Sequence, residues 1–207
     1  MKKKTVALLL SLVLVFGVVA GGTFAWLTQT TPSVENTFTY GDINIELTEE
    51  NPVNKQANII PGVNITKDPK VTVKANSEAC WLFVKVEEKN WPSFTETTEA
   101  GTTTRKVDYS VDVSANGWTK LTGVEGVDNV YYREVSATEA QSGATYYVLA
   151  GNDDYANGVV TVSENLTKTE VNSIAAGTYP TLSFTAYAVQ KDGVTSVTDA
   201  WAKASAT

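Results

Sequence analysis

The sequence predicts an all-β protein, a jelly-roll-like antiparallel β-sandwich with one or two short peripheral helices. Apolar and polar residues alternate along several segments, as in residues 107–113, where every second side chain is apolar. A period of two is typical of a strand with one buried face. Turn-forming pairs such as Pro61-Gly62 and Asn116-Gly117 separate these segments. Short strands at such spacing indicate a sandwich or jelly roll.

About eight segments have the alternation, or the content of Tyr and Val, that strands favour. In chain order they are residues 43–47, 71–73, 82–86, 107–113, 129–135, 144–149, 159–162 and 182–189. Two stretches predict short helices: residues 168–176, with Thr167 as cap and Gly177 as stop, and residues 199–204, with Thr198 as cap. The Thr- and Glu-rich stretch 91–105 predicts an exposed loop.

The first 25 residues have the three parts of a secretory signal peptide. Lysines at positions 2–4 form the charged start, and residues 6–20 form the apolar stretch. Thr23 and Ala25 then place small side chains three residues and one residue before a bond that signal peptidase would cut. We therefore predict cleavage between Ala25 and Trp26.

After this cleavage, residues 26–207 form a single domain of ordinary size. The alternative is an uncleaved membrane anchor, because residues 6–27 are nearly long enough to cross a hydrocarbon core of about 30 Å. The preferred hypothesis is a secreted protein of the cell surface or extracellular matrix, which meets the membrane only through its signal peptide.

The charge and the cysteine content limit the possible partners and bonds. Loss of the three N-terminal lysines leaves 13 basic and 23 acidic residues, a formal charge of −10. Such a charge argues against nucleic acid or anionic lipid as a partner. Cys80 is the only cysteine, so no intramolecular disulfide forms, and its apolar neighbours predict a small buried hydrophobe.

The chain contains no histidine. This excludes Ser-His-Asp and Cys-His nucleophilic sites and His-Glu-x-x-His zinc chemistry. We therefore predict no catalytic residue, no metal and no cofactor, although a pair of carboxylates for glycoside cleavage stays open. Asp153 and Asp154 predict a turn, and a calcium ion bound there is the alternative.

Motifs at both ends of the chain resemble one known family. Residues 21–25 read Gly-Gly-Thr-Phe-Ala, and residues 36–47 read Asn-Thr-Phe-Thr-Tyr-Gly-Asp-Ile-Asn-Ile-Glu-Leu. Together they resemble the start of the TasA/camelysin family of Gram-positive bacteria. The Pro61-Gly62 turn and residues 67–69 (Lys-Asp-Pro) continue the likeness, and residues 184–190 with Ala200-Trp201 are similar to the ends of clostridial members.

The resemblance implies a jelly-roll domain that a dedicated signal peptidase, SipW, processes after Ala25. It also implies assembly into fibres of a biofilm matrix, in which a freed N-terminal segment inserts into the neighbouring subunit as a donated strand. In this chain that segment is residues 26–37, with Trp26, Leu27 and Val34 as candidate apolar plugs. Pro32 makes it a poor β-former, and the alternative is an ordinary flexible N-terminus.

Camelysin was described as a metallo-endopeptidase, but the chain without histidine lacks an ordinary zinc site, and no catalytic residue is carried over. The leading hypothesis is a secreted structural subunit whose partners are copies of itself or related matrix subunits. The second is a monomeric, adhesin-like binding module that uses the loop 91–105. Trp81, Trp91 and Trp118 are possible stacking residues, although aromatic residues of a β core more often serve in packing. A hydrolase with two carboxylates is the third and weakest hypothesis.

Overall fold

The computed structural model describes residues 35–36, 43–49, 58–97, 99–174 and 180–206. The predicted cleavage site at Thr23, Ala25 and Trp26 lies outside these residues, as do Leu27 and Val34. In the described part of the chain, no helix is long and apolar enough to cross a membrane.

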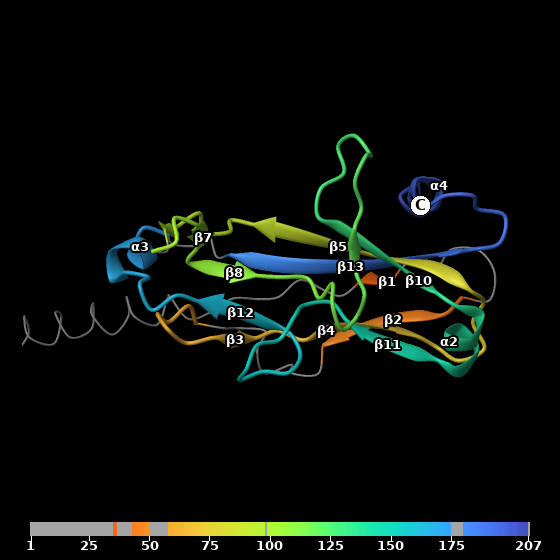
Figure 1. The fold of residues 1–207 in the computed structure, drawn as a ribbon, viewed down its shortest axis with the longest axis horizontal. Coiled ribbons are helices and arrows are strands. Elements are labelled where there is room, and N and C mark those ends of the chain that lie inside the picture. Colours follow the sequence, from red (N-terminus) through yellow and green to blue (C-terminus); the bar gives the residue numbers. More distant parts are fainter. Residues whose placement is uncertain (1–34, 37–42, 50–57, 98, 175–179, 207) are drawn as a thin grey trace, which may run out of the picture.

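Two layers of strands form an elongated sandwich (Figure 1). One layer is a five-stranded sheet of order β1-β13-β5-β10-β9. Its strands are β1 (Glu35–Asn36), β13 (Thr181–Gln190), β5 (Cys80–Lys89), β10 (Val130–Val135) and β9 (Thr119–Lys120). All pairings in this sheet are antiparallel except that of β1 with β13.

Two three-stranded sheets make up most of the other layer. The first, of order β11-β4-β2, contains β11 (Ala144–Tyr147), β4 (Pro69–Val73) and β2 (Ile45–Glu49). The second, of order β3-β12-β8, contains β3 (Ile65–Thr66), β12 (Val159–Val162) and β8 (Val107–Tyr109). A separate hairpin consists of β6 (Thr95–Thr97) and β7 (Thr103–Arg105). The predicted all-β antiparallel sandwich is confirmed.

The main core lies between the layers and follows from the alternation in the sequence. On β5 and β13, alternate residues point inward and are buried, among them Leu82, Val84 and Phe184. They meet the buried residues of β2 and β4. Cys80 is 0% exposed in this core, and burial raises the pKa of its thiol to about 12. The prediction that Cys80 is a small buried hydrophobe is confirmed.

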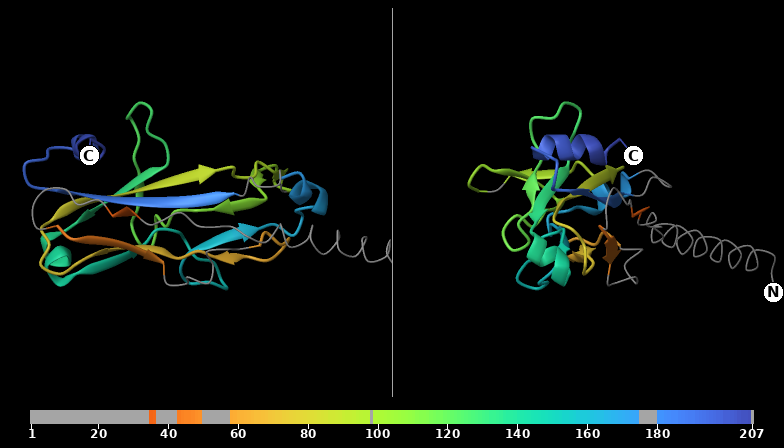
Figure 2. Two further views of the ribbon diagram at one scale, coloured as in Figure 1. Left: turned by 180° about the vertical axis from the view of Figure 1, so that it is seen from behind. Right: turned by 90° about the vertical axis from the view of Figure 1, so that its right-hand side faces the viewer.

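A second core covers the outer face of the five-stranded sheet. The C-terminal helix α4 (Val197–Ala204) lies across this face, as Figure 2 shows. The Trp201 ring lies 5.4 Å from that of Phe83 and 5.4 Å from that of Tyr187, centroid to centroid. The helix therefore packs on an aromatic surface through one large side chain.

The structure corrects the predicted helices. Helix α3 (Lys168–Asn172) follows its predicted cap Thr167 but is shorter than predicted, and Gly177 lies outside the described residues. Helix α4 begins after Ser196 rather than Thr198, because the Ser196 hydroxyl accepts a hydrogen bond from the Asp199 N–H at 3.1 Å. A third helix, α2 (Ala137–Ser142), was not predicted and starts with a capping box of Ser136 and Glu139.

Two other predictions were partly wrong. The stretch 91–105 is not wholly a loop, because it contains the β6–β7 hairpin. The strand predicted over residues 107–113 ends at Tyr109, and Val111 forms only a single bridge with Leu149. Beyond it, the Asp112 carboxylate accepts hydrogen bonds from the backbone N–H groups of Ser114 and Ala115, which turns the chain.

Replacement of Trp201 by Ala is expected to destabilise the domain by about 3–5 kcal/mol, because it leaves a cavity against Phe83 and Tyr187. The free energy of unfolding from urea denaturation measures the effect. Thr198→Ser, an exposed change that keeps the hydroxyl bonded to Ser196, is the control and is expected to stay within about 0.5 kcal/mol of the parent. Equal stability of the two variants would contradict the second core.

Candidate functional site

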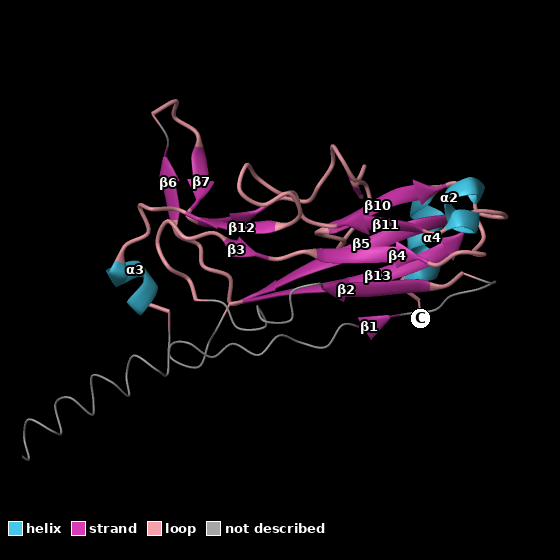
Figure 3. Cartoon of the chain, turned by 90° about the horizontal axis from the view of Figure 1, so that it is seen from below, coloured by secondary structure: helices cyan, strands magenta, loops and turns pink. Residues whose placement is uncertain are grey.

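The edge of the five-stranded sheet at β13 receives part of the predicted strand-donating segment. Within residues 26–37 the structure describes Glu35 and Asn36, which form β1. Glu35 lies opposite Thr185 and Asn36 opposite Ala186, in a parallel pair. Figure 3 shows β1 at the margin of the layers. The structure thus brings this end of the segment to β13 of its own chain.

The β13 strand is firmly held on its other side. All ten of its residues, Thr181–Gln190, have an antiparallel partner on β5. Its inward-facing side chains are buried in the main core, and its outward-facing Tyr187 lies against Trp201 of α4. Strand β13 is therefore held by β5 along one edge, by the main core on its inner face and by α4 at Tyr187 on its outer face. Its other edge, where β1 pairs, is the margin of the sheet.

The pairing on that edge is small by comparison. The described β1 pairs with two residues of β13, whereas β5 pairs with ten. Parallel pairs are also slightly less stable per residue than antiparallel pairs. Short elements with few buried contacts open first in a native protein. In the described part of the sheet, β1 and β9 (Thr119–Lys120) are therefore the shortest edge strands, and β1 is the one that comes from the predicted strand-donating segment.

The β6–β7 hairpin, in the stretch predicted to bind a ligand, is tied down at its base. The Arg105 guanidinium donates to Glu88 Oε1 at 2.8 Å through Nη1 and to Asp108 Oδ1 at 2.8 Å through Nε. It also lies 5.4 Å from the ring centre of Tyr109. Burial, with the nearby Glu88 carboxylate, raises the pKa of Tyr109. The hairpin is thus presented on a fixed base.

The three tryptophans proposed for stacking all take part in packing. Trp118 is 1% exposed, and its indole N–H donates to the Tyr147 carbonyl at 2.8 Å. It is therefore a core residue, which agrees with packing as the more common role of such aromatic residues and leaves it unavailable for stacking on a ligand. Trp91 contacts Tyr109 edge to face, and Trp81 contacts Tyr132 in the same way. Only Trp91 lies beside the hairpin.

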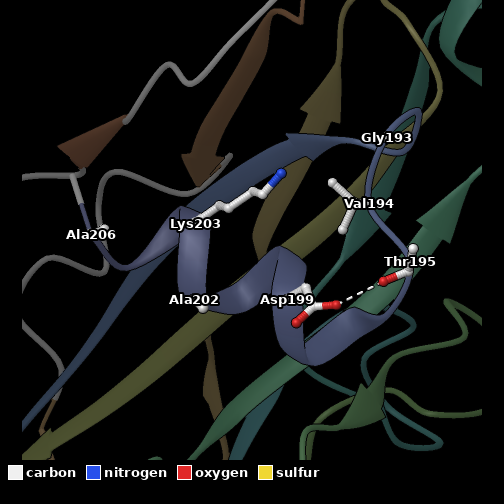
Figure 4. Close-up of a pocket in the computed structure, with 7 residues that line it drawn as sticks. All are labelled: Gly193, Val194, Thr195, Asp199, Ala202, Lys203 and Ala206. Atoms are coloured by element: carbon white, nitrogen blue, oxygen red, sulfur yellow. Dashed lines mark hydrogen bonds between the residues drawn. The ribbon is translucent and has the colours of Figure 1, made fainter.

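A shallow hollow lies between helix α4 and the loop that precedes it (Figure 4). It has a volume of about 440 Å³, and its lining residues are Gly193, Val194, Thr195, Asp199, Ala202, Lys203 and Ala206. The Thr195 hydroxyl donates to the Asp199 carboxylate at 2.9 Å. Hydrogen bonds from Ser196 and Thr195 lower the pKa of Asp199. The hollow therefore combines an apolar floor with a charged rim.

Asp153 and Asp154 are both exposed. Their turn is formed by Asn152, whose side-chain oxygen accepts hydrogen bonds from the N–H groups of Asp154 and Tyr155 at 3.1 and 2.9 Å. Within the described ranges, no group of three or more His, Cys, Asp or Glu residues is placed to hold a metal ion.

A family model described as camelysin metallo-endopeptidase matches residues 1–81. The resemblance to the camelysin family is confirmed there. The matched part contains the predicted signal peptide and strands β1 to β4, and it ends at Trp81 near the start of β5. No curated protein and no solved structure gives a significant match to the chain.

The donor atoms of this chain do not fit the zinc site that the family's description implies. A catalytic zinc ion takes three protein ligands, usually including histidine. The sequence has no histidine, and no cluster of three ligating residues occurs in the part of the chain that the structure describes. No proteolytic step is therefore derived from these residues.

Replacement of Arg105 by Gln is expected to loosen the hairpin base, because Glu88 and Asp108 lose their shared cation. Amide hydrogen exchange in β6 and β7 should speed up about five-fold, equivalent to about 1 kcal/mol for a partly exposed ion-pair network. Lys74→Gln, which removes the exposed pair with Glu46, is the control. Unchanged exchange in the Arg105 variant would show that packing alone holds the hairpin.

Proposed function

We propose that this protein is a secreted structural subunit of extracellular fibres, assembled after its signal peptide is removed. The observation that carries the proposal is the position of β1. Glu35 and Asn36, the described part of the predicted strand-donating segment, lie on the β13 edge opposite Thr185 and Ala186. The camelysin family model matches the part of the chain that contains this segment, residues 1–81. The fibre function itself is what the resemblance to TasA-like proteins implies.

In the proposed assembly, residues 26–37 leave the β13 edge of their own chain and occupy the β13 edge of a neighbouring copy. A donated strand adds main-chain hydrogen bonds along an edge and covers its open backbone groups. The exchange is favourable if the donated ladder is longer than the one that the segment forms in its own chain, of which the structure describes Glu35–Asn36. Trp26, Leu27 and Val34 are the side chains proposed to anchor the strand.

Signal-peptide cleavage is proposed to control this exchange. While residues 1–25 remain attached, the segment that follows them is tethered to the export machinery and the membrane. Cleavage by a SipW-type peptidase between Ala25 and Trp26 gives the segment a free end. The mature protein is then proposed to act in the matrix or on the cell surface without a cofactor, and to form fibres rather than to cleave peptides.

Electron microscopy of the mature protein, residues 26–207, tests the proposal directly. Fibres are expected from the mature protein and none from a form that starts at residue 38, at equal concentration. The matched control keeps the segment but replaces Trp26, Leu27 and Val34 by Ser, and it is expected to assemble poorly. Fibres from the form that starts at residue 38 would overturn strand donation by this segment.

A reversible lock on β1 gives a second, sharper test. Glu35 and Thr185 are partners in the β1–β13 pair, so Glu35→Cys with Thr185→Cys places two thiols on adjacent strands. The purified disulfide form is expected to stay monomeric, and a reductant is expected to restore fibre growth. The buried Cys80 is not expected to interfere. Thr185→Cys alone is the control, and equal fibre growth by the locked form would contradict release of β1.

A second candidate function is a monomeric surface-displayed binding module. The observation that favours it is the β6–β7 hairpin, whose threonines Thr95, Thr97, Thr103 and Thr104 are exposed on a base fixed by Arg105. In the described part of the chain, neither strand of the hairpin pairs with another strand. Monodisperse particles from every preparation above, with specific binding to a glycan or protein, would favour this function over fibre assembly.

A further inference from the structure

One exposed turn carries most of the large apolar side chains on the described surface. Ile60 is 46% exposed and Val63 is 48% exposed, and Val113 is the remaining large hydrophobic residue of this kind. Ile60, Pro61, Gly62 and Val63 are consecutive, and we call them the apolar turn. Two half-exposed aliphatic side chains are too small a patch to mark a contact by themselves, so the turn is of interest only together with a complementary surface.

The apolar turn is held rigidly. The Val63 N–H donates to the Ile60 carbonyl at 3.0 Å, and the Gly62 N–H donates to the Ser163 carbonyl at 3.3 Å. Gly62 has a φ of +73°, which side chains rarely adopt, so glycine suits this position. Next to it, Ile59 packs against the main core. The turn therefore presents Ile60 and Val63 as a preformed knob, at little cost in conformational entropy.

The hollow beside α4 is a complementary surface. Gly193, Val194, Ala202 and Ala206 provide small or apolar walls to this shallow hollow. Ala202 and Ala206 are exposed and lie one turn apart on α4 and its C-terminal end. Small side chains at this spacing leave the surface of the helix open to contact by another molecule.

The charges beside the two surfaces are opposite. Glu164 lies next to the apolar turn, because its Cβ is 3.5 Å from where a side chain on Gly62 would begin. Lys203 lies on the rim of the hollow. The described residues form no ion pair with Glu164 or Lys203, but Lys203 lies near Asp199 on the same rim and helps to lower the pKa of that carboxyl. A carboxylate that approaches the Lys203 side of the rim beside an aliphatic knob would therefore meet a cation, whereas on the Asp199 side it would meet a like charge.

These surfaces lie toward opposite ends of the sandwich. The apolar turn is bonded to Ser163, shortly before α3, and Figure 1 shows α3 at one end and α4 toward the other. The turn therefore cannot fill the hollow of its own chain. We propose that the apolar turn of one copy docks into the α4 hollow of the next copy, with Glu164 facing Lys203. This inference rests on the proposed fibre function and names an end-to-end interface within it.

Such a contact is heterologous, so each copy keeps one unused surface at each end and addition continues into a filament. One turn in one hollow buries much less than the roughly 1,200–2,000 Å² of a standard interface, so the contact alone is weak. A strand donated between the same two copies raises the effective concentration of the turn at the hollow. The turn then fixes the spacing of neighbours, and the strand supplies most of the affinity.

Crosslinking of two single-cysteine variants of the mature protein tests the interface. Val63→Cys and Ala202→Cys proteins, mixed in equal amounts and oxidised, are expected to form a disulfide-linked heterodimer. Neither protein alone is expected to dimerise to a comparable extent. The native Cys80 is buried and its thiol pKa is raised to about 12, so it stays unreactive. A mixture of Val113→Cys with Ala202→Cys controls for random collision, and equal yields from the two mixtures would overturn the inference.

Charge reversal distinguishes this contact from strand donation. In the Val63→Cys and Ala202→Cys mixture, adding Glu164→Lys to the first protein is expected to lower the crosslink yield about two- to five-fold, as for a partly exposed ion pair. Adding Lys203→Glu to the second protein should restore the yield. No restoration would overturn the assigned partners. Fibres without the crosslink would contradict the interface but agree with the proposed function. The crosslink without fibres would support the interface and contradict the proposed function.

Discussion

The ten-residue antiparallel pairing of β13 with β5 is the interaction on which the rest of the structure depends. Its inner face supplies the main core, and its outer face supplies the aromatic surface under α4. The edge of β13 opposite β5 is the one with which β1 pairs. Because the main core, the second core and the β1 edge all involve β13, a shift of this strand would change the packing in both cores. Tyr187, next to the paired Ala186, packs against Trp201 and connects the edge with the C-terminal helix.

The sequence predicted those parts of the fold in which burial produces a regular pattern. The inward positions of β5, β13 and β4 alternate with polar ones, so their strands were recognisable. The β6–β7 hairpin was missed because its threonines are exposed on both faces and give no alternation of polarity. Helix α2 was missed because six residues are too few for a periodic signal, although its Ser136 and Glu139 capping box was visible.

The candidate site was predictable only in part, for a different physical reason. The motif of residues 21–25 and the likeness of residues 36–47 to known relatives indicated a segment with a role in assembly. Its pairing partner depends on the three-dimensional arrangement, since Glu35 and Thr185 are far apart in sequence and meet through tertiary packing. The hollow beside α4 was equally invisible, because it arises where Ala202 and Ala206 leave space next to a loop. Small residues such as Ala202 and Ala206 give no periodic signal from which a hollow could be predicted.

The position of β2 determines the direction in which a released N-terminal segment would reach a neighbour. Asn44, just before β2, is hydrogen-bonded to Lys74 and Ser77, near α2 and the Gln190 end of β13. The segment is therefore attached at the α2 end, which is also the end that α4 lies toward.

A neighbour whose apolar turn occupied the α4 hollow would present the Thr181 end of its β13 at this junction. In the donated strand, residue 37 would lie near the Thr181 end of the neighbour's β13, and residue 26 would lie farther along it. The donated strand would run antiparallel to β13, whereas β1 within one chain runs parallel. Because antiparallel pairs are slightly more stable per residue, exchange between copies would replace a weaker ladder by a stronger one.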